Sequence, residues 1–153
     1  MFPRSGALAD AALRYHCLLK TLLVDIDGAL LRHCLARVGG RQPLAVASSK
    51  AQSIELLRHG PPVDVVVVCE RLEDGSGLAL LDEVHARWPH LIRVFCAERQ
   101  RLALLRTRLS ALRLRHTLLY PFKPIKLEQM LVHLGQTRGN PTARMRRPLR
   151  PEG

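Results

Sequence analysis

Short apolar runs alternate with amphipathic stretches along most of the chain. Runs of nearly continuous Leu, Val and Ile are typical of strands that are buried on both faces of a parallel sheet. They occur at residues 21–26, 43–48, 63–69, 91–97 and 116–120, and helical patterns follow them near residues 28–38, 50–59, 77–87, 98–113 and 125–135. Five strand–helix units in succession predict an α/β fold, with a doubly wound, five-stranded parallel sheet inside a three-layer sandwich.

Glycine and proline support these boundaries. They occur at residues 39–40, 60–62 and 89, where a helix is predicted to stop and a strand to begin, because neither residue extends a helix cheaply. In open sheets of this kind, ligands bind outside the carboxyl ends of the strands. The residues to consider for function are therefore those that follow the strands: Asp25, Ile26, Asp27, Cys69, Cys96 and Lys123.

Three segments are predicted along the chain. Residues 1–19 form an N-terminal extension with a helical pattern, residues 20–136 form the folded domain, and residues 137–153 form a tail rich in Arg and Pro. The tail is expected to be disordered, because it cannot bury enough apolar surface to fold alone. It is interpreted as a linker, as a plain terminus, or as a basic arm that binds nucleic acid or a cyclic dinucleotide through Arg144, Arg146, Arg147 and Arg150.

The charge of the chain is strongly positive. The sequence has 24 Lys and Arg against 13 Asp and Glu, a formal net charge of +11. Such a surplus favours acidic partners, such as nucleic acid, an anionic membrane surface or an acidic protein face, although a well-solvated, Arg-rich surface also accounts for it. The charge is concentrated in the fourth predicted helix, where two rows of arginines flank an apolar arc that is predicted to face the core. The arc is Leu102, Leu105, Leu109 and Leu112, and the arginines are Arg99, Arg101, Arg106, Arg108, Arg113 and Arg115.

The four cysteines do not form a metal-binding or disulfide pattern. They stand at positions 17, 34, 69 and 96, without a Cys-x-x-Cys pair. The spacing argues against a zinc site or a disulfide framework, and reduced thiols in a cytoplasm fit better. No apolar run is long enough to span a bilayer, and Asp10 and Arg14 interrupt the start of the chain where a signal peptide is apolar. A cytoplasmic location is therefore expected.

Residues 20 to 136 resemble the receiver domains of bacterial two-component response regulators. The resemblance rests on LLVDID at the first strand, DVVVVCERLEDGSGLALLDEV at the third, LIRVFCAE at the fourth and YPFKP before the last helix. The family's usual eight-residue step from phosphoacceptor to glycine matches the step from Cys69 to Gly77. The resemblance implies a flavodoxin-like (βα)5 fold. It also implies a pocket in which an aspartate accepts phosphate, acidic residues hold magnesium, a hydroxyl senses the phosphoryl group and a lysine binds its oxygens.

Only part of that set is present. By resemblance, Asp25 and Lys123 match the family pattern and Tyr120 is the switch aromatic, whereas Ile26 replaces an acidic residue. Cys69 stands at the phosphoacceptor and Cys96 at the sensing hydroxyl. A one-residue slip of the third strand is the alternative, and it makes Glu70 the acceptor or a phosphate mimic. Magnesium prefers oxygen ligands in near-octahedral geometry, so its binding is expected to be weak or lost. No catalytic residue, metal or cofactor is expected.

The resemblance implies a degenerate receiver domain that acts through protein contacts without phosphorylation. In that family the fourth helix, fifth strand and fifth helix commonly form a homodimer or meet an output partner, so a homodimer is expected through this face. A phosphatase is one alternative, because LLVDIDGALL also resembles the first motif of haloacid dehalogenase-type phosphatases. There Asp25 is the nucleophile, Asp27 the acid and base, and Lys123 the charge stabiliser. No aspartate follows Lys123 to complete that site. A basic adaptor that binds nucleic acid or a cyclic dinucleotide through its arginines is the other alternative.

Overall fold

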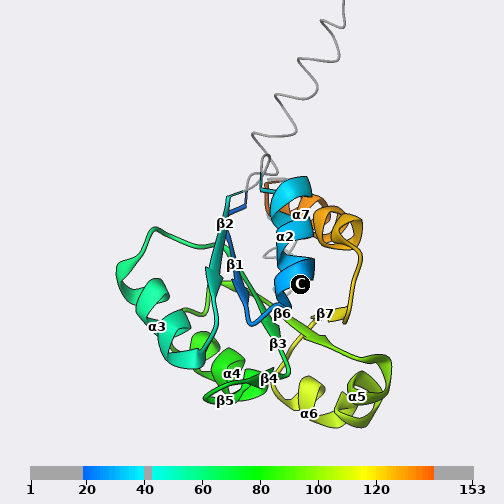
Figure 1. The fold of residues 1–153 in the computed structure, drawn as a ribbon. Helices are drawn as coiled ribbons and strands as arrows, with labels where there is room; N and C mark the ends of the chain where they lie inside the picture. The colour runs from blue at the N-terminus through cyan, green and yellow to red at the C-terminus, as the bar shows by residue number, and fades with distance from the viewer. Residues whose placement is uncertain (1–18, 40–42, 140–153) are drawn as a thin grey trace, which may run out of the picture.

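A five-stranded, all-parallel sheet forms the centre of the protein, as predicted (Figure 1). The computed structural model describes residues 19–39 and 43–139, so the predicted N-terminal helix and the tail arginines lie outside the described residues. The strand order is β2-β1-β3-β6-β7. The bounds of these strands are Thr21–Val24 for β1, Leu44–Ala47 for β2, Val65–Cys69 for β3, Ile92–Ala97 for β6 and His116–Leu119 for β7.

Helices cover both faces of the sheet (Figure 1). Side chains of α2 (Gly28–Arg37) and α7 (Pro124–Gly139) form one buried cluster with the sheet. Side chains of α3 (Lys50–His59), α4 (Gly77–Arg87), α5 (Arg99–Leu104) and α6 (Arg106–Ala111) pack on the opposite face. Helix α7 continues past residue 136 into the segment that was predicted to be tail. These layers are those of the predicted three-layer sandwich.

The central strand β3 shows how the sequence selects the two faces. All five of its residues, Val65 to Cys69, are buried, because helices lie above and below it. Successive side chains of a strand point to opposite faces. Val67 and Cys69 therefore lie in the cluster with α2 and α7, and Val66 and Val68 lie in the other cluster. This alternation places the Cys69 thiol on a defined side of the sheet.

A small hairpin follows β3 and was not predicted. Strands β4 (Arg71–Leu72) and β5 (Gly75–Ser76) pair antiparallel between β3 and α4. At its tip, the carboxylate of Asp74 accepts the backbone N–H groups of Lys50 and Ala51, at 2.6 and 3.0 Å. These two hydrogen bonds lower the pKa of Asp74 below its ordinary value, since they favour the charged carboxylate. The hairpin thereby ties the loop after β3 to the start of α3.

The prediction of one continuous helix over residues 98–113 is wrong in one respect. The chain forms α5 and α6 in succession, because Leu105 between them has ψ of 6° instead of a helical value. The N–H of Leu105 still donates to Arg101 and that of Leu109 to Leu105, so the interruption is one residue wide. A change in one dihedral angle leaves no mark on hydrophobic periodicity. The leucine arc itself faces the core, with Leu109 buried and the other three leucines half-buried against the same cluster.

Arg113 ends α6 in a conformation that normally favours glycine. Its φ is 59°, its N–H donates to Ser110, and the N–H of Leu114 donates to Leu109. This is the pattern of a Schellman motif, with the left-handed residue just after the helix and a buried contact between Leu109 and Leu114. A side chain in this region has a steric cost that glycine avoids.

We therefore expect Arg113→Gly to stabilise the protein by about 1 kcal/mol, which corresponds to the left-handed backbone penalty of a single residue. Urea unfolding of the variant measures the change. Arg108→Gly is the matched control, since it removes the same exposed charge from an ordinary helical position of α6. The control is expected to destabilise by about 1 kcal/mol. Equal effects of the two variants would show that the backbone conformation of Arg113 carries no cost.

Candidate functional site

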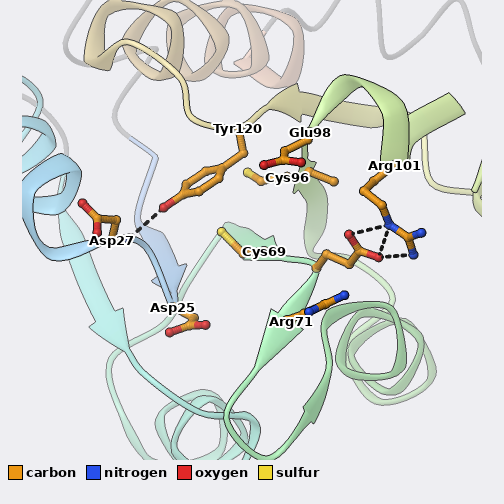
Figure 2. A pocket seen from close by; sticks show the side chains of 10 residues that line it. Asp25, Asp27, Cys69, Arg71, Cys96, Glu98, Arg101 and Tyr120 are labelled. Atoms are coloured by element: carbon orange, nitrogen blue, oxygen red, sulfur yellow. Dashed lines mark hydrogen bonds and ion pairs between the residues drawn. The ribbon is translucent and has the colours of Figure 1, made fainter. Parts of the chain in front are cut away.

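A pocket of ≈ 530 Å³ opens at the carboxyl ends of β1, β3 and β6 (Figure 2). This is the edge at which open α/β sheets bind ligands. Four of its lining residues were predicted from the ends of strands, Asp25, Asp27, Cys69 and Cys96, and Tyr120 was predicted as the switch aromatic. The other lining residues are Glu70, Arg71, Ala97, Glu98 and Arg101.

Of the three residues that follow β1, Asp25 and Asp27 line the pocket and Ile26 lies in the core. Asp25 has φ of 56° and is exposed, and desolvation together with the nearby Glu73 carboxylate raises its pKa above the ordinary value. Asp27 caps α2, because its carboxylate accepts the N–H groups of Ala29 and Leu30. Ile26 lies between them with its side chain buried among core residues. The prediction that Ile26 forms part of the pocket is therefore wrong, since its apolar side chain turns inward.

Two thiols lie at the floor of the pocket. Cys69 ends β3 and Cys96 is its partner in the register of β6, and their side chains are buried. The neighbouring Cys69 side chain, together with burial, raises the pKa of Cys96 well above its ordinary value. Cys34 of α2 belongs to the same buried cluster, and burial also raises its pKa. The register leaves Cys69, and not Glu70, at the buried strand end, which removes the alternative of a one-residue slip.

An ion pair closes one side of the pocket. The guanidinium of Arg101 donates to both carboxylate oxygens of Glu70, at 2.8 and 3.1 Å from Nε and at 2.5 Å from Nη2 (Figure 2). This bidentate geometry is the strong form of an Arg–carboxylate contact. The Glu70 contact raises the pKa of Arg101 further above its ordinary value. Arg101 was predicted as part of an interaction face, but its guanidinium is committed to the pocket.

Tyr120 reaches across the opposite side of the pocket (Figure 2). Its hydroxyl oxygen accepts the backbone N–H of Asp27 at 3.0 Å, and its ring stands edge-on to Phe122 with centroids 6.0 Å apart. Burial raises the pKa of Tyr120, so the hydroxyl stays protonated at neutral pH. The tyrosine thus links β7 to the start of α2.

Lys123 does not line the pocket. Its side chain is exposed, and its backbone carbonyl accepts the N–H of Lys126 at the start of α7. The prediction that Lys123 belongs to the pocket is wrong in this structure. A physical reason is at hand, because Cys69 supplies no carboxylate with which the Lys123 ammonium group can pair.

The other predicted arginines of the interaction face remain at the surface. They lie on or next to α5 and α6, and all five are exposed: Arg99, Arg106, Arg108, Arg113 and Arg115. Leu104 lies among them and is 74% exposed. The surface formed by Leu104 and these arginines therefore has both apolar and cationic character.

The oxygen donors of the pocket do not fit a magnesium site well. Asp27 is engaged in capping α2 and Glu70 is held by Arg101, which leaves Asp25 without an oxygen partner from either. Within residues 19–39 and 43–139, no group of three or more His, Cys, Asp or Glu side chains is placed to hold a metal ion. The thiols beside Asp25 are soft ligands, which magnesium does not prefer.

The topology and the place of the pocket define a flavodoxin-like fold of the receiver-domain type. A signal receiver domain of an HD domain-containing protein from Pseudomonas fluorescens Pf-5 is similar, with a TM-score of 0.68 and 21% identity over 80% of this chain and 89% of that one. A response regulator receiver domain protein from Clostridium thermocellum has a TM-score of 0.66 at 18% identity, over 79% of this chain and 96% of that one. An adenylate cyclase from Rhodopirellula baltica has a TM-score of 0.70 at 15% identity, over 86% and 97% of the two chains.

These likenesses concern the fold. No protein-family model matches the sequence, and no curated protein is similar to it in sequence. Within the part of the chain that the structure describes, each helix is too short or too polar to cross a membrane.

Proposed function

We propose that this protein is a receiver-like signalling module that works through protein contacts and does not accept phosphate. One observation carries the proposal: the residue at the carboxyl end of β3 is the buried thiol of Cys69. In the receiver domains that the chain resembles, this position holds the phosphoacceptor aspartate. A thiol at the end of an apolar strand behaves mostly as a small hydrophobic group.

The neighbouring carboxylates are poor substitutes for the missing acceptor. Glu70 is neutralised by Arg101, whose guanidinium occupies both of its oxygens. Asp27 is held by two backbone N–H groups. Asp25 has a raised pKa, and within residues 19–39 and 43–139 no group of three or more His, Cys, Asp or Glu side chains is placed to hold a metal ion, so we expect only weak magnesium binding at this pocket.

The proposed module has its switch aromatic already fixed. The Asp27 N–H donates to the Tyr120 hydroxyl and holds the ring toward the pocket. The partner face, by resemblance, consists of α5, α6, β7 and α7, where Leu104, Leu119 and Ile125 are exposed by 74%, 42% and 37%. We propose that a second copy of the chain or an output protein binds this face, and that the module works in the cytoplasm, where its thiols stay reduced.

The test is to treat the purified full chain with acetyl phosphate and magnesium and to follow its mass and oligomeric state together. We expect no mass gain of a phosphoryl group and an unchanged oligomeric state. A receiver domain with an intact acceptor aspartate serves as the positive control. A stable phosphoryl gain on any residue contradicts the proposal.

The same preparation separates the phosphatase alternative. Hydrolysis of p-nitrophenyl phosphate is measured with magnesium for the protein and for Asp25→Asn. We expect no hydrolysis above background in either, because Asp27 is held by two backbone N–H groups at the start of α2 and Lys123 does not line the pocket. Turnover that disappears in Asp25→Asn supports the phosphatase and contradicts the proposed function.

A further inference from the structure

The two positions at which this chain departs most from a phosphate-accepting pocket are both cysteines, and the structure makes them neighbours. Cys69 and Cys96 are register partners on adjacent parallel strands. Both belong to the buried cluster with α2 and α7, so their side chains leave the sheet on the same face. Both thiols are free. Their spacing in the sequence, 27 residues apart, gives no sign of this pairing.

The backbone geometry permits a disulfide at this place. Neighbouring strands lie about 4.8 Å apart, inside the range of about 4.4 to 6.8 Å that disulfides span between Cα atoms. Partner Cβ atoms of a disulfide are closer, at about 3.5 to 4.5 Å. A bond between Cys69 and Cys96 therefore draws the ends of β3 and β6 together.

The thiols are also within reach of a small oxidant. Both line the pocket, and Cys69 is 7% exposed whereas Cys96 is 0% exposed. Figure 2 shows both sulfur atoms on the side of the pocket where Tyr120 and Asp25 lie. A molecule as small as hydrogen peroxide therefore reaches Cys69 first, and Cys96 lies beside it on the neighbouring strand.

We propose that Cys69 and Cys96 are a peroxide-sensitive dithiol, whose reversible disulfide sets the state of this pocket in place of phosphorylation. The inference rests on the proposed function, for which it names the regulating signal. The Cys69 sulfur attacks peroxide, the O–O bond breaks, and a sulfenic acid and one water form. The Cys96 sulfur then attacks the sulfenic sulfur, the S–O bond breaks, and the hydroxide leaves with the Cys96 proton as a second water. Two thiols have lost two electrons to one peroxide, and a dithiol reductant reverses the change.

Hydrogen bonds connect the site of the proposed disulfide to Tyr120, the proposed switch aromatic. Ala97 follows Cys96, and its carbonyl accepts the N–H of Tyr120 at 3.0 Å. The Tyr120 hydroxyl in turn accepts the N–H of Asp27. A shift at the end of β6 therefore acts on the tyrosine, which lies beside the proposed partner face.

The experiment uses the full chain with Cys17→Ala, so that Cys34, Cys69 and Cys96 are the remaining thiols. The protein is incubated with hydrogen peroxide, and its mass and its unreduced tryptic peptides are measured before and after dithiothreitol. Trypsin separates the three cysteines, since an arginine lies between each pair. We expect loss of the mass of two hydrogens, a Cys69–Cys96 linked peptide and full reversal. With 3-fluorotyrosine, the ¹⁹F signal of Tyr120, assigned with Tyr120→Phe, is expected to shift and return.

Matched variants decide the assignment. Cys34→Ala is expected to form the same Cys69–Cys96 disulfide. In Cys96→Ala, oxidation is expected to stop at the Cys69 sulfur, without a disulfide. Four results would overturn the inference: thiols that stay reduced, a disulfide that includes Cys34, disulfides only between chains, or separate over-oxidation of each sulfur. Each of these results leaves the phosphodonor experiment unaffected, whereas a phosphoryl gain there removes the proposed function itself.

Discussion

Replacing Gly77 with alanine is expected to destabilise the protein by about 3 kcal/mol or more, at the upper end of what an overpacked site costs. A Cβ at this position stands 1.9 Å from the carbonyl oxygen and 2.9 Å from the carbonyl carbon of Cys69, and 3.1 Å from a methyl group of Val68. The first two contacts are with backbone. The N–H of Gly77 donates to the backbone carbonyl of Glu70 at 2.7 Å, so the start of α4 cannot move away without losing this hydrogen bond.

Gly28→Ala is the matched control. It makes the same substitution at the start of another helix, where the nearest group to the added Cβ is the flexible end of Arg32, at 3.9 Å. We expect a change within about 1 kcal/mol, in the stabilising direction, because alanine restricts the unfolded chain. Urea unfolding of both variants gives the comparison. A Gly77→Ala variant as stable as Gly28→Ala would contradict this prediction, because it would show that the loop between β3 and α4 can shift to accommodate the added Cβ.

The eight-residue step from Cys69 to Gly77 now has a physical explanation. The resemblance to receiver domains identifies the step, but the sequence alone gives no reason for a glycine at its end. In the structure, the first residue of α4 packs directly on the carbonyl of the last residue of β3. The requirement for glycine therefore comes from how closely two backbones approach, and it remains although the phosphoacceptor is absent.

The architecture was predictable because strands buried on both faces have an unambiguous signature. The apolar runs gave all five strands of the central sheet, and Gly and Pro gave the helix ends. The two-residue strands β4 and β5 were not predictable, because they are too short to show a period of two. The interruption at Leu105 was also missed, since leucines at 102, 105, 109 and 112 satisfy one helix as well as two.

The site was predictable only as far as strand ends determine it. Asp25, Asp27, Cys69 and Cys96 meet at one edge because parallel strands end together. Matching the sequence to receiver domains does not reveal in which direction a side chain points. Ile26 and Lys123 were therefore predicted in the pocket, but Ile26 is buried in the core and Lys123 is exposed to solvent. The pair of Glu70 and Arg101 joins segments that are far apart in the sequence, and nothing local in either predicts it.

Removing the guanidinium of Arg93 is expected to be the second most damaging change, with a loss of about 2–3 kcal/mol in Arg93→Met. Arg93, the second residue of β6, is 8% exposed, and its side chain donates to three backbone carbonyls. Leu81 lies in α4, at 3.4 Å, while Leu112 and Arg113, at 3.0 and 3.2 Å, follow the last turn of α6. Burial lowers the pKa of Arg93 from its ordinary value, but an arginine remains charged. A cation at the end of a helix is favourable, and methionine keeps the apolar stem while leaving the carbonyls without this donor.

Arg106→Met is the control, because it removes an exposed arginine from α6, the helix whose end Arg93 contacts, and its effect is expected to stay within about 0.5 kcal/mol. Urea unfolding again measures both. If Arg93→Met is as mild as the control, water replaces the guanidinium at these carbonyls, and the end of α6 does not depend on β6. If the loss is as large as expected, the anchor of α6 is a buried charge inside the sheet. The proposed partner face then rests on the same strand that carries Cys96, so a displacement of β6 acts on both the tyrosine and the helix that would meet a partner.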